Sequence, residues 1–170
     1  MSKPSRQPSC KARMVVFLFR QITRRSFGMS VTLPTNLQAE IFKQMEATYP
    51  NEGGGFLLGD IRQGVTHIVD VIGVENVFET EEQYHRYAMT PQNWSKMEDE
   101  ADARGLVLVG YYHSHPDSPA IPSVYDRDHA LPNFVYIITS VQNGKAVDMT
   151  CWRLRPDRTA FDAEQLHIQA

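Results

Sequence analysis

Apolar residues recur at helical spacing in residues 35–49, the first stretch of the chain with a clear periodicity. Such spacing predicts an amphipathic helix. Thr35, with Gln38 three residues later, has the pattern of a capping box at its start, and Pro50 predicts its end. The apolar positions are Leu37, Ile41, Phe42, Met45 and Tyr49.

Short apolar runs bounded by turn residues predict strands in the rest of the chain. The Gln63-Gly64 and Asn143-Gly144 steps predict hairpins between neighbouring runs. Residues 75–83 contain four glutamates and predict an exposed, mobile loop. The runs are Phe56–Leu58, Val65–Val74, Arg86–Met89, Leu106–Tyr112, Phe134–Val141 and Ala146–Leu154.

Two more helices are predicted between these strands. Thr90 followed by Pro91 is typical of a helix start, and Gly105 of its end. A short helix is expected over residues 123–130, whereas residues 161–168 show no clear pattern. Strands mixed with helices in one domain predict an α/β fold, with three layers and a mixed central sheet between helices.

Charge divides the chain into two parts. Its 170 residues have a net charge of −3, but residues 1–28 contain seven basic and no acidic residues. We expect residues 1–28 to be a disordered leader, or no part of the native chain, with a targeting peptide or a basic arm as alternatives. Residues 29–170 form one acidic domain, which disfavours binding to nucleic acid or an anionic membrane.

Cysteine content and hydropathy restrict the setting of the protein. Cys10 and Cys151 are too few for a disulfide framework or an all-cysteine metal site. The longest apolar run, Met14–Phe19, is too short for a membrane span or a signal-peptide core. We therefore expect a cytoplasmic protein.

The segment His113-Ser114-His115 contains the first candidate chemistry. Residues two apart on a strand point to the same face, so the two imidazoles form a pair of nitrogen ligands. A catalytic zinc ion needs three protein ligands and an open position. The alternative is a solvated strand end without a metal.

Two carboxylates complete the candidate constellation. Ser123 and Asp126 are spaced as a helix cap and its first-turn acid, and that turn would also direct the Asp126 carboxylate toward the imidazoles. Glu52, before the Gly53-Gly54-Gly55 run, is a candidate general base; alone it would be an ordinary loop glutamate.

These residues together resemble the JAMM (MPN+) metalloprotease family. Its motif is a glutamate, a long gap, and then His-x-His-x7-Ser-x2-Asp, which Glu52, His113, His115, Ser123 and Asp126 match in type and spacing. The resemblance covers residues 33–155 and is nearest to the compact, stand-alone prokaryotic branch. Gly53 and Gly54 depart from that branch, which often has cysteine just after the glutamate.

The resemblance implies a fold, a cofactor and a role for each residue. The fold would be the cytidine-deaminase-like JAMM fold with one Zn²⁺ per chain. His113, His115 and Asp126 would be the metal ligands, Glu52 the general acid/base and Ser123 the oxyanion donor. Zinc would make a bound water more acidic, and Glu52 would transfer its proton to the leaving amine.

The implied substrate is a ubiquitin-like or ThiS/MoaD-like sulfur-carrier protein, cleaved after its C-terminal Gly-Gly as a peptide or isopeptide. A flexible Gly-Gly tail can enter a narrow channel. The alternative function is a non-catalytic binding module for such a partner. A DNA-repair-associated branch shares a similar motif, but the acidic domain lacks the basic clusters that phosphate contact needs. The remaining histidines and two acids are expected to be structural or solvated: His67, His85, His129, His167, Asp117 and Asp128.

Overall fold

The computed structural model describes residues 30–77, 83, 86 and 90–170. The predicted leader, Cys10, His85 and the greater part of the predicted strand Arg86–Met89 lie outside the described residues. The elements in chain order are β1 (Ser30–Pro34), α1 (Thr35–Thr48), β2 (Gly54–Arg62), β3 (Val65–Val74), α2 (Pro91–Ala103), β4 (Val107–Pro116), α3 (Val124–His129), β5 (Val135–Gln142), β6 (Lys145–Leu154) and β7 (Phe161–Gln169).

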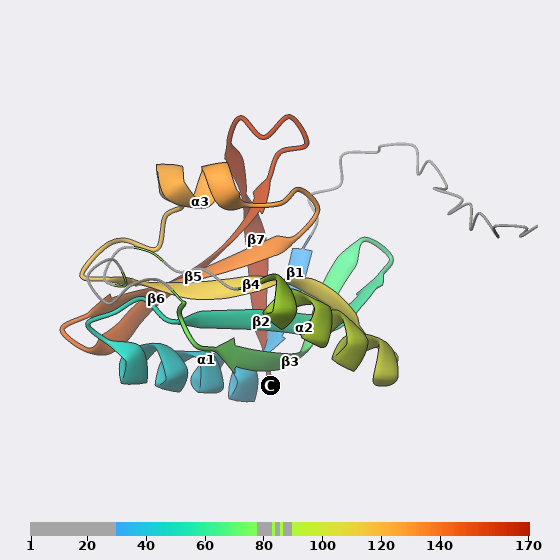
Figure 1. Ribbon diagram of the computed structural model, residues 1–170, viewed down its shortest axis with the longest axis horizontal. Coiled ribbons are helices and arrows are strands. Elements are labelled where there is room, and N and C mark those ends of the chain that lie inside the picture. The colour runs from blue at the N-terminus through green and yellow to red at the C-terminus, as the bar shows by residue number, and fades with distance from the viewer. Residues whose placement is uncertain (1–29, 78–82, 84–85, 87–89) are drawn as a thin grey trace, which may run out of the picture.

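The strands pair in the order β1-β3-β2-β4-β5-β6-β7 and close into a barrel (Figure 1). The mixed α/β class is therefore confirmed, but the expected three-layer arrangement around a central sheet is not, because the sheet closes on itself. The reason is β1, which pairs in parallel with both β3 and β7 and so joins the two ends of the sheet. Neither β1 nor β7 was predicted as a strand.

The two predicted hairpins are confirmed. Strands β2 and β3 are antiparallel around Gln63 and Gly64, and β5 and β6 around Asn143 and Gly144. All four turn residues have positive φ, between 50° and 81°. Glycine and asparagine tolerate this backbone region, which is why these dipeptides indicate a tight turn.

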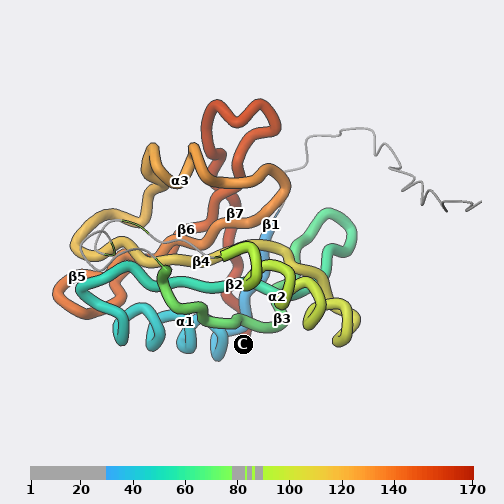
Figure 2. The backbone as a smooth tube through the Cα atoms, in the orientation of Figure 1, coloured from blue at the N-terminus to red at the C-terminus, as the bar shows by residue number. Residues whose placement is uncertain are grey.

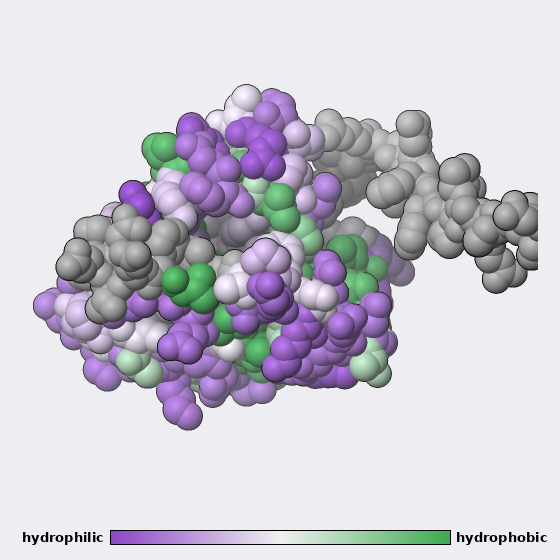
Figure 3. Space-filling model, viewed as in Figure 1, coloured by the Kyte–Doolittle hydropathy of each residue, from purple (hydrophilic) through white to green (hydrophobic). Residues whose placement is uncertain are grey.

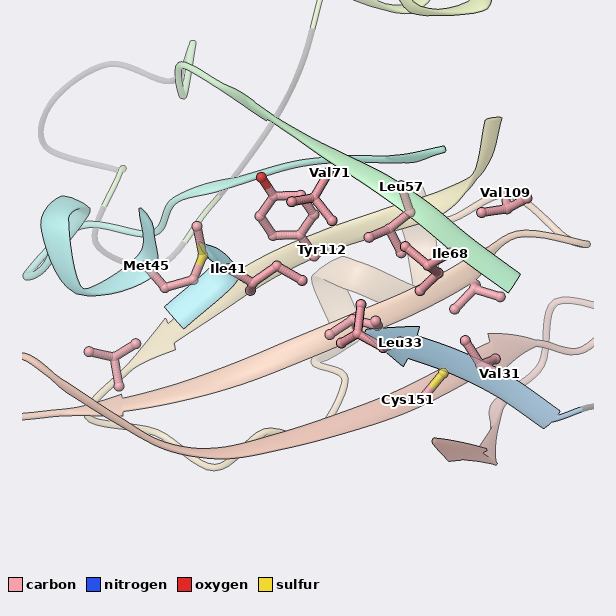
Figure 4. Packing of buried hydrophobic residues seen from close by; sticks show 13 residues of the cluster. Val31, Leu33, Ile41, Met45, Leu57, Ile68, Val71, Val109, Tyr112 and Cys151 are labelled. Atoms are coloured by element: carbon pink, nitrogen blue, oxygen red, sulfur yellow. The ribbon is translucent and has the colours of Figure 1, made fainter. Parts of the chain in front are cut away.

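Two apolar clusters lie on opposite faces of β2 and β4 because strand side chains alternate. Leu57 and Tyr112 belong to the first cluster, with Ile41 and Met45 of α1 (Figure 4). Phe56, Tyr111 and Met97 of α2 belong to the second. Helices α1 and α2 thus cover opposite faces of these two strands.

Helix starts agree with the sequence in two of three cases. Thr90 and Ser123 cap α2 and α3, as predicted, and in both helices the structure shows a complete capping box. The capping box predicted at Thr35 is wrong: Pro34 is the N-cap residue, and the Thr35 hydroxyl donates to the carbonyl of Gln169 instead. That contact with β7 is long-range, so local spacing could not indicate it.

The path of the chain places α3 and α1 on opposite sides of the strands in the view of Figures 1 and 2. The face shown in Figure 3 is mostly hydrophilic, with only small hydrophobic patches. Among the described residues, no helix combines the length and apolar character that a membrane crossing requires.

Candidate metal centre

Strand β4 places His113 and His115 on one face, as the alternation of strand side chains predicts. Their Nε2 atoms are 3.1 Å apart, and both side chains are buried. The strand pairs with β2 up to His113 and with β5 up to Pro116. The imidazoles therefore lie where the pairing of β4 with β2 ends, while β5 still holds the other edge of β4.

Helix α3 brings Asp126 to the two imidazoles. Its Oδ1 is 3.1 Å from His113 Nε2, and its Oδ2 is 3.4 Å from His115 Nε2. The Ser123 hydroxyl accepts from the Asp126 amide, and the Ser123 amide donates to the Asp126 carboxylate. The cap and the ligand direction are thus produced by the same turn, as the spacing predicted.

The three side chains have the chemistry and spacing of a metal site. One ligand atom from each lies within 4.8 Å of the others. A tetrahedral zinc ion with bonds of about 2.0–2.1 Å holds its ligand atoms roughly 3.3 Å apart, close to the separations in this group. Two nitrogens and one oxygen also suit other divalent metals. His113, His115 and Asp126 could therefore hold a metal ion.

The charges in this group reinforce one another. Burial by itself raises the pKa of Asp126, but the charge and hydrogen bonds of His113, together with His115 and Ser123, lower it well below its usual range. Burial lowers the pKa of His113, but the raising effect of Asp126 and Glu52 is larger. The pKa of His113 therefore lies above its ordinary value. The carboxylate is consequently ionised and ready to bind a cation.

The loop between His115 and Asp126 is held by side chains of β4, β5 and β6. Pro119 O accepts from His115 Nδ1 at 3.0 Å, and Ser118 O accepts from Ser140 at 2.6 Å. Ala120 O accepts from Thr150 and Trp152. Hydrogen bonds from three strands to its carbonyl groups therefore fix the path of this loop.

Glu52 lies in the connection between α1 and β2 and is only 7% exposed. Burial raises the pKa of its carboxyl to about 8. The charge of His113 lowers this pKa, and the charge of Asp126 raises it. The next residue, Gly53, forms two hydrogen bonds with Ser114, the residue between the two histidines. The structure therefore brings Glu52 to the histidine-bearing strand.

A pocket of about 290 Å³ opens beside this group. Its polar lining includes Glu52, His115 and Ser123, and its apolar lining includes Pro119 and Ile121. A substrate in the pocket would therefore meet the carboxyl, one imidazole and the capping hydroxyl together. All five candidate residues are thus adjacent, either in the metal-ligand group or at the pocket wall.

The sequence did not identify the residues that hold this arrangement in place. Asn76 and Gln83 belong to the predicted mobile loop, yet both contact the backbone of Glu52. Asp117 is exposed, as expected, but it also accepts from Tyr49 and Asn143. Single polar residues in loops have no spacing signal, so only their contacts reveal them. Residues 78–82 of that loop lie outside the described part of the chain.

Of the described histidines, His67, His129 and His167 take no part in the metal-ligand group. His67 lies 2.9 Å from the Thr32 hydroxyl, and His129 stacks on Tyr125 with ring centroids 4.0 Å apart. His167 is exposed on β7. These described histidines agree with the expectation of structural or solvated roles.

Known proteins resemble the part of the chain that contains the candidate site. A family of prokaryotic homologs of the JAB domain matches residues 34–155. Desampylase of Haloferax volcanii is 38% identical over 55 residues, 32% of this chain and 40% of that protein. An MPN domain-containing protein of Homo sapiens is 72% identical over 25 residues, 15% of this chain and 5% of that protein. The matches thus span less than half of each relative.

Two solved structures share the fold. The solution structure of protein DSY2949 from Desulfitobacterium hafniense has a TM-score of 0.71 at 24% identity, covering 82% of this chain and 92% of that chain. A protein from Salinibacter ruber has a TM-score of 0.62 at 33% identity, covering 81% and 90%.

Proposed function

The chain belongs to the family of prokaryotic JAB-domain homologues, and from this premise we propose that it is a zinc-dependent hydrolase for ubiquitin-like modifiers. The reaction would be hydrolysis of the amide or isopeptide bond after the C-terminal Gly-Gly of a ubiquitin-like or ThiS/MoaD-like sulfur-carrier protein. The observation that supports it most is the buried Glu52 at the wall of the pocket that His115 also lines. The catalytic domain would comprise residues 29–170, after a basic leader.

His113, His115 and Asp126 would hold one zinc ion per chain. When bound, the ion would supply Lewis acidity, which polarises a carbonyl group and makes a water molecule more acidic. Both histidines would bind through Nε2, because these atoms face the Asp126 carboxylate. The remaining steps depend on side chains of the pocket wall.

Glu52 would be the general base and then the general acid. Its carboxylate would accept a proton from the attacking water, and the resulting carboxyl would donate that proton to the leaving amine. Burial supports the acid step because it raises the pKa of Glu52 to about 8 in the metal-free protein, so the carboxyl can hold a proton at neutral pH. The positive charge of a bound zinc ion would lower this pKa and favour the carboxylate that the base step needs.

Ser123 would donate a hydrogen bond to the developing oxyanion. As a cap, its hydroxyl oxygen accepts from the Asp126 amide, which uses a lone pair of the oxygen and leaves its own proton free to donate. The residue also lies at the pocket wall. The capping role and the proposed catalytic role are therefore compatible.

The substrate assignment combines the relatives with the shape of the site. The name desampylase implies removal of a modifier from a protein, and the matched segment of that relative is partial. A Gly-Gly tail without side chains would fit a pocket whose apolar lining comes from Pro116, Pro119 and Ile121. We place the reaction in the cytoplasm, a proposal supported by the free, buried thiol of Cys151.

The proposal is tested with a fusion in which a Gly-Gly-ended sulfur-carrier protein is joined by an amide bond to a second protein. Purified zinc-loaded protein should separate the two, and Glu52→Ala should keep its zinc and fold but lose at least about a hundredfold in turnover. Glu46→Ala, which removes a half-buried carboxylate on α1 that does not line the pocket, is the matched control. Near-normal cleavage by Glu52→Ala would refute the mechanism, and tight binding without cleavage by the wild type would favour a binding module.

A further inference from the structure

The backbone of Glu52 lies just beyond the strand ladder. The last pairs of β2 join Gly54 to Val74 on β3 and to His113 on β4. One residue earlier, Gly53 still exchanges hydrogen bonds with Ser114. At Glu52 itself β3 has ended, so strand pairing cannot hold this peptide.

Two residues that follow β3 replace the missing strand. The amide nitrogen Nδ2 of Asn76 donates to Glu52 O at 3.1 Å, and Glu52 N donates to Gln83 O at 2.7 Å. Both polar groups of the Glu52 backbone are therefore satisfied by the segment that was predicted to be a mobile loop. The contact from Asn76 comes from a side chain, so it depends on residue type, whereas the contact from Gln83 comes from its backbone.

Asn76 also connects Glu52 to the opposite side of the site. Its Nδ2 makes a second hydrogen bond, to Arg86 O at 2.6 Å. Because both acceptors are carbonyl oxygens, the nitrogen must be the atom that faces them, and its two protons serve one acceptor each. The Arg86 guanidinium lies over the ring of Tyr125, the residue before Asp126, at 5.3 Å from its centroid.

We propose that Asn76 is the positioning residue of Glu52. Its side-chain amide holds the Glu52 carbonyl where the strand ladder ends, and so fixes the direction of the Glu52 carboxyl toward the pocket. The inference rests on the proposed function, because a direction matters only if Glu52 transfers protons. A displacement of about 1 Å in such a group can reduce turnover by about a hundredfold.

The first test measures hydrolysis of the same Gly-Gly fusion by zinc-loaded Asn76→Ala. We expect kcat to fall by about 10- to 100-fold, KM to stay within about twofold and zinc content to remain unchanged. Gln83→Ala is the matched control, because its backbone contact to Glu52 survives truncation of the side chain, whose contacts with Asn51 and Asn76 are both 3.4 Å long. Equal activities of the two variants would overturn the proposal.

The second test needs no substrate and so separates this proposal from the proposed function. Asn76→Ala should loosen the segment that carries Gln83 O, which is the acceptor of the Glu52 amide. Amide hydrogen exchange at Glu52, followed by NMR, should therefore be at least about tenfold faster in this variant, while exchange at Leu57 in the middle of β2 stays the same. If the wild type cleaves no fusion, this comparison alone decides whether Asn76 positions Glu52. Wild-type exchange at Glu52 in Asn76→Ala would refute the positioning role.

Both measurements are repeated on Asn76→Asp, because the aspartate side chain has nearly the same volume as asparagine. It replaces the donor with an acceptor opposite two carbonyl oxygens, so we expect a loss at least as large as in Asn76→Ala. This variant keeps the test valid if Asn76→Ala does not fold. A wild-type result for Asn76→Asp in both measurements would also overturn the proposal.

Discussion

Gly53 and Ser114 are joined by two hydrogen bonds across 61 residues of sequence. Ser114 N donates to Gly53 O at 2.9 Å, and Gly53 N donates to Ser114 Oγ at 3.0 Å. Gly53 follows the proposed general base, and Ser114 separates the two proposed histidine ligands. The pair therefore fixes the distance between the two functional parts of the site, and both partners are buried.

Ser114→Ala should destabilise the protein, because it leaves the buried Gly53 amide without an acceptor. We expect a loss of about 1–3 kcal/mol in the free energy of unfolding, measured by chemical denaturation. Thr139→Val is the matched control: Thr139 faces Ser114 on β5, and its hydroxyl is buried without a hydrogen-bond partner. That variant should be neutral or stabilising, and equal losses in the two would contradict the role of the Gly53–Ser114 pair.

Glu52→Gln should stabilise the metal-free protein more as the pH rises. The folded-state pKa of Glu52 is about 8, whereas the ordinary value of a glutamate is 4.5. The stability that the neutral carboxyl contributes is therefore complete below pH 4.5 and is lost as the pH rises through 8. Glutamine avoids this loss, which amounts to about 5 kcal/mol at full ionisation. Thermal unfolding at pH 5 and pH 9 measures the difference.

Glu46→Gln serves as the control with the opposite sign. Hydrogen bonds from the Ala146 amide and the Lys145 ammonium lower the pKa of Glu46. Its stabilising effect is therefore present above pH 4.5 and lost in acid, so Glu46→Gln should destabilise at pH 7 and have less effect at pH 3. A pH-independent difference for Glu52→Gln would mean that Glu52 is not buried as described.

Asp126→Ala should lose the metal. We expect about one zinc per wild-type chain after dialysis and none in the variant, by elemental analysis. Zinc at a hundredfold excess over its dissociation constant should stabilise the wild type by about 2.7 kcal/mol and leave Asp126→Ala unchanged. Asp128→Ala, which removes an exposed carboxylate two residues away, should behave like the wild type; retention of zinc by Asp126→Ala would exclude this ligand set.

Acid should release the metal at an unusually high pH. A histidine binds a metal only through a deprotonated nitrogen, and the pKa of His113 lies above its ordinary value because Asp126 outweighs the opposing effect of burial. Protons therefore compete with the metal earlier than at an unperturbed imidazole. Zinc release followed with a chromogenic chelator between pH 8 and pH 5 checks this, and a release midpoint well below pH 6 would contradict it.

Ser123→Ala should separate capping from catalysis. Loss of the cap costs about 1 kcal/mol, and loss of an oxyanion donor lowers kcat by about 10²- to 10³-fold. Thr90→Ala removes the equivalent cap of α2 and should cost similar stability, with turnover within about twofold of the wild type. If both variants lose turnover equally, Ser123 acts only as a cap.

Much of the candidate site follows from short-range rules. His113 and His115 share a face because strand side chains alternate, and Ser123 directs Asp126 because a capping box joins positions three apart. The turns at Gln63-Gly64 and Asn143-Gly144 follow from the backbone preferences of those residues. Each of these features depends on neighbours within a few positions, so spacing alone predicts it.

Other features depend on contacts between distant parts of the chain. β1 is only five residues long and has no distinctive pattern, yet its pairing with β3 and β7 closes the barrel. Likewise, Asn76 reaches Glu52 across 24 residues and Thr150 reaches the carbonyl of Ala120 across 30. Residue type and spacing thus specified the reacting groups, whereas the closed sheet and the hydrogen bonds that orient them arise from long-range packing, which no local periodicity encodes.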